Sequence, residues 1–241
     1  MKNSLENRGI VLMGASGGIG SATALCLARP NVNMAICSID EKGLKELADS
    51  LIEKGANVFV KVVDVTKEDE VSSFIGEAAS LFGNLDILIN FAGLSVTATV
   101  ENLSEADYDK VMDVNVKGMF FGIKHFVPLV GLDRGAQIIN FGSMAAKRAN
   151  PGAPHYSAAK AAVNMFSAGL AQQLKSKNIK ITTLNPGPTD TTFFEGRIPK
   201  EKRTRFMQAD DVAEVIEFIL TREAHIVFHD IEFESFEFFK G

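Results

Sequence analysis

The sequence predicts an α/β fold, a doubly wound parallel sheet of about seven strands with helices on both faces, in a single domain over residues 1–241. Three observations support this prediction. Short apolar runs recur along the chain, segments with helical periodicity separate them, and no linker, charge block or internal repeat divides the chain. Almost continuous apolarity is typical of strands buried on both faces, as in parallel sheets covered by helices.

The apolar runs give the expected strands in chain order. Each is short and rich in β-branched residues, which favours a strand over a buried helix. The runs are Ile10–Leu12, Val32–Cys37, Val58–Val63, Leu85–Asn90, Gln137–Phe141, Lys180–Asn185 and Ile226–Phe228.

About six helices are expected between these strands, the first over Ser21–Arg29. Local signals mark two further helix starts. Thr66 precedes an acidic first turn, and Ser104 followed by Asp107 resembles a capping box. After the last expected strand, glutamate alternates with phenylalanine in IEFESFEFF, so we expect extended chain there, whose apolar stripe forms core or a subunit contact.

Composition excludes several classes of function. The net charge of −5 argues against a nucleic-acid partner, because phosphate binding needs clustered Lys and Arg. The N-terminus lacks the apolar region of a signal peptide, and no apolar stretch is long enough for a membrane span, which favours a cytoplasmic protein without a membrane partner. Cys26 and Cys37 fall in an expected helix and strand, so we expect free thiols in a reducing compartment. No metal site is expected, since His225 and His229 flank a strand-like run.

A glycine cluster follows the first expected strand. The stretch MGASGGIG contains Gly14, Gly18 and Gly20 in the pattern G-x-x-x-G-x-G, directly before the first helix. A loop without Cβ atoms lets backbone amide groups approach a pyrophosphate, and a helix N-terminus adds partial positive charge. A purely structural tight turn is the alternative, because a glycine pattern alone is a weak signal.

Polar clusters at the ends of other strands extend this pattern. Asp64-Val65 follows the third strand, Asn90-Phe91-Ala92-Gly93 the fourth and Asn185-Pro186-Gly187 the sixth. Ser143 lies just past the fifth strand, and Tyr156-Ser-Ala-Ala-Lys160 opens the next helix. Ligands bind at the carboxyl ends of strands in such sheets, so these clusters should converge.

Together with MGASGGIG, this set resembles the short-chain dehydrogenase/reductase family in order and spacing over residues 8–220. The resemblance implies a Rossmann fold that binds a nicotinamide dinucleotide. Met13 and Phe91 depart from the residues usual in the family, although the glycines are all present. The implied cofactor-binding residues are Gly14, Ser16, Gly18, Ile19, Gly20, Ser38, Asp64, Val65, Asn90, Ala92, Gly93, Tyr156, Lys160, Pro186, Gly187, Thr189 and Thr191.

Tyr156 and Lys160 are the candidate proton-transfer pair. Four residues apart on a helix, they share one face, and a nearby cation lowers the pKa of a tyrosine. Tyr156 would then act as general acid or base in the interconversion of a carbonyl and a secondary alcohol, with Ser143 stabilising the substrate oxygen. The resemblance adds Asn115, which would help to hold a water for proton relay to Lys160.

Each of these residues has a structural alternative. A Tyr-x-x-x-Lys pair is commonly a solvated helix face, Ser143 can simply end a strand, and Asn115 can bond to helix backbone. Their joint occurrence at strand ends favours an enzyme. The rival interpretation is a catalytically silent nucleotide-binding sensor or scaffold of the same fold.

The choice between NAD(H) and NADP(H) rests on the end of the second strand. Neither family signature is present, because Ser38 stands where NAD-type enzymes carry an acid, and Ile39 and Gly17 stand where NADP-type enzymes carry basic residues. Ser38 can bond a 2′-phosphate without repelling it. Lys42 lies nearby, so NADP(H) is slightly favoured over NAD(H). Asp40 would reverse this preference if it turned toward the ribose.

Residues 192–208, here called the substrate loop, occupy the place of the family's variable substrate segment. An apolar surface with a basic rim would suit an acidic or acyl-linked carbonyl substrate, the latter as in the family's 3-oxoacyl reductases. A solvated basic loop is the favoured alternative. The loop combines Phe193, Phe194, Ile198 and Phe206 with Arg197, Lys200, Lys202, Arg203 and Arg205.

A homo-oligomer, dimer or tetramer, is expected by resemblance only.

Overall fold

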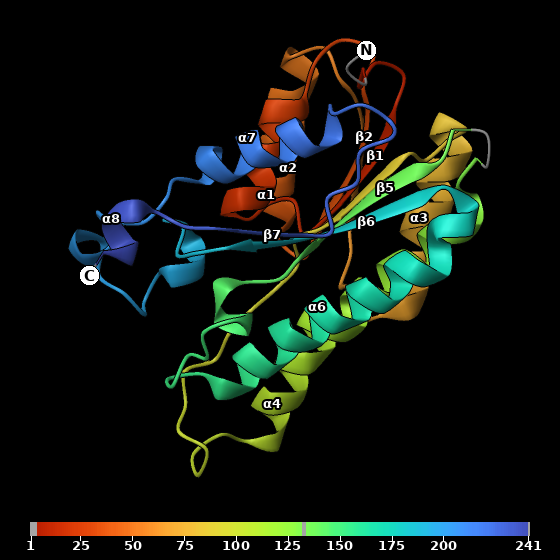
Figure 1. The fold of residues 1–241 in the computed structure, drawn as a ribbon. Coiled ribbons are helices and arrows are strands. Elements are labelled where there is room, and N and C mark those ends of the chain that lie inside the picture. Colours follow the sequence, from red (N-terminus) through yellow and green to blue (C-terminus); the bar gives the residue numbers. More distant parts are fainter. Residues whose placement is uncertain (1–3, 132–133, 241) are drawn as a thin grey trace.

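The computed structural model describes residues 4–131 and 134–240. These residues form one parallel sheet of seven strands in the order β3-β2-β1-β4-β5-β6-β7 (Figure 1). β1 lies inside the sheet, with β2 and β3 in sequence on one side of it and β4 to β7 in sequence on the other. The strands are β1 Gly9–Met13, β2 Asn33–Ser38, β3 Asn57–Val62, β4 Ile87–Asn90, β5 Ala136–Phe141, β6 Ile179–Pro186 and β7 Asp230–Phe233.

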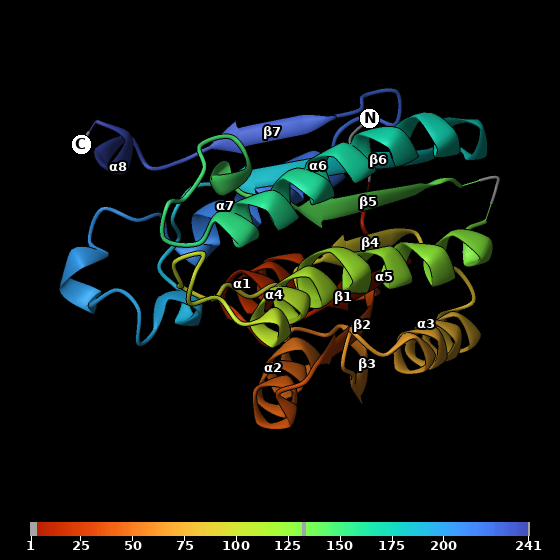
Figure 2. The same cartoon turned by 90° about the horizontal axis from the view of Figure 1, so that it is seen from below.

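Helices cover both faces of this sheet. Figures 1 and 2 show α1, α2 and α7 on one face and α3, α4, α5 and α6 on the other, with the short α8 beside the C-terminus. This arrangement confirms the predicted doubly wound α/β fold. The helices are α1 Gly18–Leu27, α2 Glu41–Glu53, α3 Glu68–Phe82, α4 Glu105–Met112, α5 Gly118–Phe126, α6 Pro154–Leu174, α7 Ala209–Leu220 and α8 Phe236–Phe239.

The hydrophobic core lies in two layers, one on each side of the sheet. Ile10 and Leu12 of β1 pack with α1, α2 and α7, whereas Val11 and Met13 pack with α3 and α5. Successive side chains of a strand point to opposite faces, so an uninterrupted apolar run fills both layers. The double-sided burial expected from the sequence is therefore present.

Six of the predicted strands overlap β1 to β6, but the seventh prediction was wrong. Residues 226–228 are irregular, and β7 begins at Asp230. The side chains of β6 explain the difference, since Lys180 Nζ donates to the Ile226 carbonyl (3.0 Å) and Thr182 Oγ1 to the Phe228 carbonyl (2.7 Å). The Ile226 and Phe228 carbonyls are therefore hydrogen-bonded to side chains, whereas in a strand they would accept from backbone amides.

The expectation of extended chain up to the last phenylalanines was also wrong. Phe236–Phe239 form the helical turn α8, and Phe238 packs against Phe206 with ring centroids 5.6 Å apart. The alternation of glutamate and phenylalanine therefore does not continue as a strand beyond Phe233.

Both predicted helix starts are confirmed, since α3 begins with an acidic first turn just after Thr66 and α4 begins after Ser104, but only one has the expected side-chain cap. Ser104 Oγ accepts the amide of Asp107 at 3.0 Å and caps α4. Thr66 does not cap α3, whose N-cap residue is Lys67. The Thr66 hydroxyl instead donates to Asp64 Oδ1 at 2.7 Å, because that carboxylate lies two residues away at the end of β3.

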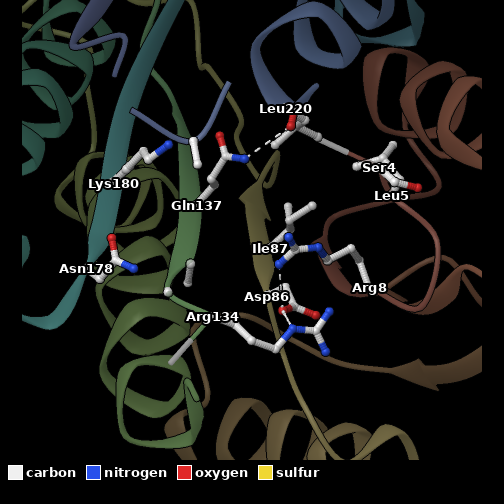
Figure 3. Close-up of a pocket in the computed structure, with 13 residues that line it drawn as sticks. Ser4, Leu5, Arg8, Asp86, Ile87, Arg134, Gln137, Asn178, Lys180 and Leu220 are labelled. Carbon is white, nitrogen blue, oxygen red and sulfur yellow. Dashed lines mark hydrogen bonds and ion pairs between the residues drawn. The ribbon is translucent and has the colours of Figure 1, made fainter. Parts of the chain in front are cut away.

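A small cavity of about 70 Å³ lies at the amino-terminal edge of the sheet (Figure 3). Asp86 is 2% exposed, and its Oδ1 forms ion pairs with Arg8 Nη1 at 3.0 Å and Arg134 Nε at 3.2 Å. Its Oδ2 accepts a hydrogen bond from the Gly9 amide at 2.9 Å. Asp86 therefore pairs with two guanidinium groups, and its bond to the Gly9 amide ties β1 to the start of β4. Within residues 4–131 and 134–240, no helix is long and apolar enough to cross a membrane.

Candidate active site

The candidate site lies at the carboxyl-terminal edge of the sheet. Figure 2 shows the arrows of β5 and β7 pointing toward the end of the molecule where α8 and the segment after β6 lie. The polar clusters of the sequence follow β1, β4, β5 and β6 at this edge. Adjacent carboxyl ends in a parallel sheet are the usual place for a ligand.

The glycine turn between β1 and α1 is closely packed against its neighbours. Gly14 has φ +84°, and a Cβ there would lie 2.7 Å from the Ala92 amide nitrogen. A Cβ on Gly18 would overlap the Thr191 side chain, so the segment after β6 reaches this turn. Gly20 packs against the Gly14 carbonyl, which a Cβ would approach to 2.7 Å.

The N-terminus of α1 fits a phosphate group. Gly17 is its N-cap residue and supplies no side-chain hydrogen bond, so the first-turn amides lack a side-chain cap. A Cβ built on Gly17 meets no atom within 4 Å, so there is open space beside the N-terminus of α1. Free amides at a helix N-terminus favour an anion, so the turn fits the pyrophosphate of a dinucleotide.

The region that decides between NAD and NADP lies beside this turn. Ser16 Oγ donates to Ser38 Oγ at 2.7 Å. Asp40 does not turn inward, because Asp40 Oδ1 caps α2 by accepting the Gly43 amide at 3.1 Å. Lys42 is exposed and pairs with Glu46 at 3.7 Å.

The predicted adenosine-side residues follow β3 and β4. Asp64 accepts both the Thr66 amide and its hydroxyl, and these bonds outweigh the opposing effect of burial and hold the pKa of Asp64 below its usual value. Val65 is buried against Gly118 at the start of α5. Asn90 Nδ2 donates to Asn140 Oδ1 at 2.8 Å, which links β4 to β5.

The side chains of Asn115 and Lys160 approach each other at Gly93. A Cβ there would lie 2.9 Å from Asn115 Oδ1 and 3.4 Å from Lys160 Nζ, so the absence of a side chain lets both groups approach. Lys160 Nζ donates to the Phe141 carbonyl at 2.8 Å. This contact anchors the α6 lysine to the end of β5, directly before the Ser143 segment.

Asn115 lies in a π-helical turn, Asp113–Lys117, between α4 and α5. Its Nδ2 donates to the carbonyls of Leu94 and Val111, both at 2.8 Å, while its buried Oδ1 has no hydrogen-bond partner among the residues that the structure describes. Buried acceptors are normally satisfied, and π-turns inside helices often mark functional sites. The free oxygen beside Lys160 fits a bound water or ligand donor.

Ser143 and Tyr156 approach each other from β5 and α6. The Ser143 amide donates to Asn185 Oδ1 at 2.8 Å, and Asn185 Nδ2 in turn donates to Asp230 of β7. Pro154 begins α6, and the ring of Tyr156 lies 5.7 Å from Lys160 Nζ. The three candidate catalytic residues are therefore neighbours at one edge of the sheet.

The predicted electrostatic effect of Lys160 on Tyr156 was wrong for this structure. Burial raises the pKa of Tyr156 to about 12, against a hydrogen bond with Ser143 and the charge of Arg197, which both lower it. Burial also lowers the pKa of Lys160 to about 7. Desolvation disfavours both charged forms, and for Tyr156 it exceeds the opposing effects of the Ser143 hydrogen bond and the Arg197 charge.

The segment after β6 brings the last predicted residues to the site. Gly187 comes directly after Pro186, the last residue of β6, and its amide donates to the Phe233 carbonyl at 2.8 Å. Thr189 is buried, and Thr191 accepts the amide of Phe193 at 3.3 Å. The substrate loop therefore starts beside the glycine turn.

Sequence reasoning gave no individual role to two residues of the substrate loop. The Phe193 ring lies 5.9 Å from that of Tyr156, and the Arg197 guanidinium lies 4.2 Å from the Phe193 centroid. The sequence signal was only the aromatic and basic composition of the loop. No group of three His, Cys, Asp or Glu suited to a metal occurs in the part of the chain that the structure describes.

Comparison with known proteins gives consistent matches. A family model described as short chain dehydrogenase matches residues 8–202. An uncharacterized oxidoreductase of Staphylococcus aureus is 30% identical over 229 residues, covering 94% of this chain and 96% of its own length. The 3-oxoacyl-[acyl-carrier-protein] reductase FabG of Thermotoga maritima is 29% identical over 231 residues, covering 92% and 94%.

Solved structures also match over nearly the whole chain. An alcohol dehydrogenase from the archaeon Thermococcus sibiricus, complexed with 5-hydroxy-NADP, has a TM-score of 0.87 and 25% identity over 95% of this chain and 97% of its own. Levodione reductase has the same fold, with a TM-score of 0.87 at 22% identity, covering 96% of this chain and 98% of its own.

Proposed function

The chain belongs to the short-chain dehydrogenase family, and from this premise we propose that it is an NAD(P)(H)-dependent oxidoreductase that interconverts a carbonyl and a secondary alcohol. One observation carries the proposal. Lys160 Nζ and the unpartnered Asn115 Oδ1 meet at Gly93, next to Tyr156 and Ser143 and at the same sheet edge as the uncapped glycine turn. A purely structural helix face would not need this convergence.

The dinucleotide is held by backbone and small side chains. The first-turn amides of α1 bind the pyrophosphate, and Ile19 and Gly20 belong to that turn. Asp64 and Val65 border the adenine, Ala92 and Gly93 line the adenosine side, and Thr189 and Thr191 reach the nicotinamide end. The bound nicotinamide supplies or accepts the hydride.

Tyr156 moves the proton. Its hydroxyl is protonated at neutral pH, since its pKa is raised to about 12, and in the direction of reduction it donates to the substrate oxygen. The Ser143 hydroxyl donates a hydrogen bond to the same oxygen and stabilises the charge that develops there. Lys160 Nζ and a water held by Asn115 Oδ1 return a proton to Tyr156.

NADP(H) is the preferred cofactor in this proposal. Ser38 is neutral and accepts from Ser16, and Asp40 is engaged in capping α2, so no carboxylate is committed to the ribose 2′-hydroxyl. The similar alcohol dehydrogenase of Thermococcus sibiricus was solved with an NADP derivative, which supports the same preference.

The substrate is a small carbonyl or alcohol compound, with acyl-linked compounds included because FabG of Thermotoga maritima is a 3-oxoacyl reductase. Residues 192–208 cover it. The protein works in the cytoplasm as a homo-oligomer, a dimer or tetramer. The apolar side chains of Phe120, Met165 and Phe166, exposed on α5 and α6, support self-association.

A titration with NADPH and NADH tests the proposal. The chain has no Trp, so the fluorescence of the reduced nicotinamide serves as the signal. We expect saturable binding of both nucleotides, tighter for NADPH. A panel of ketones and aldehydes then separates the alternatives, because nucleotide binding without turnover of any carbonyl would favour the sensor or scaffold hypothesis.

A further inference from the structure

The cations of the substrate loop differ in their surroundings. Arg203 is buried and pairs with Asp190 at 2.7 Å, so its charge is used within the protein. Lys200, Lys202 and Arg205 are exposed. Arg197 alone among the five stacks on an aromatic ring that contacts the candidate catalytic tyrosine.

Several contacts fix the position of Arg197. Its guanidinium carbon lies 4.2 Å from the centroid of Phe193 and 5.7 Å from that of Phe194. Nη1 donates to the Ser95 carbonyl at 3.3 Å, which connects the substrate loop to the segment after β4. The guanidinium is thus held between two segments that border the site, and it remains accessible to solvent.

The charge of Arg197 has no counter-ion in the part of the chain that the structure describes. Among residues 4–131 and 134–240, no carboxylate lies within ion-pair distance of it, although its loop neighbour Arg203 has one. A guanidinium carries five N–H donors, and a single contact with a backbone carbonyl leaves most of them free. Burial raises the pKa of Tyr156, whereas the Ser143 hydrogen bond and the charge of Arg197 both lower it. The Arg197 charge therefore acts at the candidate site.

We infer that Arg197 binds an anionic group of the substrate, a carboxylate or a phosphate, and that the enzyme therefore prefers carbonyl compounds that carry such a group. The inference rests on the proposed function. A planar guanidinium pairs with either anion through two parallel hydrogen bonds. Arg197 stacks on the Phe193 ring at 4.2 Å, and that ring lies 5.9 Å from the Tyr156 ring, so the anion would bind a few methylene groups away from the reacting carbonyl.

The experiment compares matched ketones. Methyl ketones that end in a carboxylate after two, three or four methylene groups are assayed with NADPH, each beside its methyl ester. A methyl ketone that ends in a phosphate monoester is included to separate the two anions. We expect kcat/KM to be higher for the acids than for the esters, mainly through a lower KM, and the ratio to fall as salt is added.

Charge-removing variants connect this preference to one residue. Arg197→Gln should lower kcat/KM for the acids by roughly 10–100-fold and change that for the esters less than about threefold. Arg197→Lys should restore part of the preference, since it keeps the charge but not the planar donor pair. Arg205→Gln is the matched control, because it removes an equal charge from an exposed position of the same loop.

The outcomes separate this inference from the proposed function. Ester reduction with no advantage for the acids, or an acid preference that Arg197→Gln leaves intact, would overturn the inference while the oxidoreductase function stands. If Arg197→Gln and Arg205→Gln lowered kcat/KM for the acids equally, the preference would come from the total charge of the loop, and this result would also overturn the inference. If neither acids nor esters are reduced although NADPH binds, the proposed function fails for these ketones and the inference fails with it.

Discussion

At neutral pH the Tyr156 hydroxyl keeps its proton, because burial raises its pKa to about 12. In the proposed reaction it is the proton donor for reduction, and Tyr156→Phe removes that donor with little change in shape. We expect turnover to fall by about 10²–10⁴-fold while the Kd for NADPH is unchanged. Steady-state kinetics and a fluorescence titration measure the two effects, and unchanged turnover of a confirmed substrate would reject the role of Tyr156.

Lys160 predicts a pH-dependent stability. Burial lowers its pKa from about 10.5 to about 7, so between these values the unfolded chain binds more protons than the folded one. The free energy of unfolding should therefore rise with pH from about 7 toward 10, by about 1 kcal/mol per pH unit from this group. Below pH 7 both states are protonated and the slope vanishes.

Lys160→Met isolates this contribution. Urea unfolding of the ligand-free protein at pH 6, 7, 8 and 9 should give a flatter profile for the variant than for the wild type. Lys175→Met, at the exposed end of α6, is the control and should keep the wild-type slope. Parallel profiles for wild type and Lys160→Met would show that the pKa of Lys160 is not lowered.

At the scale of elements, aromatic contacts connect α6 to α8 through the substrate loop. The ring of Phe193 lies 5.9 Å from that of Tyr156 and 5.2 Å from that of Phe194. Phe194 contacts Phe206 at 5.2 Å, and Phe206 contacts Phe238 of α8 at 5.6 Å. The C-terminal turn therefore supports the loop that covers the candidate site.

Phe238→Ala tests this support. Losing an aromatic pair of this kind costs about 0.5–1.5 kcal/mol, so the loop conformation seen here becomes less stable and KM for the carbonyl substrate should rise about 2–10-fold. Phe239→Ala is the matched control, because Phe239 is 61% exposed. If both variants leave KM unchanged, α8 does not position the loop.

The elements also show what could be predicted from sequence. The central strands were predictable because double-sided burial gives an apolar run that is visible locally, as in β1. β7 alternates exposed and half-buried residues at the edge of the sheet, and this alternation predicted extended chain there without giving the ends of the strand. The irregular residues before it are held by Lys180 and Thr182, about fifty residues earlier, which no local pattern reveals.

The same limit applies to the candidate site. Family spacing predicted Ser143, Tyr156, Lys160 and Asn115 as site residues, and the structure brings them to one edge. The lowered pKa of Lys160 and the π-helical turn of Asn115 depend on burial and packing, which spacing does not encode. The contact of Arg197 with Phe193 likewise forms only when the substrate loop folds over α6.

Across the whole molecule, the two edges of the sheet use charge differently. At the carboxyl-terminal edge Arg197 and Lys160 lack carboxylate partners among the described residues, as a binding site requires. At the amino-terminal edge the buried carboxylate of Asp86 is bonded to Arg8, Arg134 and the Gly9 amide (Figure 3). We therefore expect stability and activity to be separable by mutation.

Asp86→Ala is the variant that tests this separation. It removes a carboxylate that is 2% exposed and leaves the Gly9 amide and two guanidinium groups without their acceptor, which should lower the free energy of unfolding by about 1–3 kcal/mol. Asp86→Asn keeps an acceptor for Gly9 and should lose less. At a temperature where all the proteins are folded, kcat and KM should equal the wild-type values, because Asp86 lies at the edge opposite Tyr156. A loss of kcat without a loss of stability would instead show that the two edges are coupled through the strands between them.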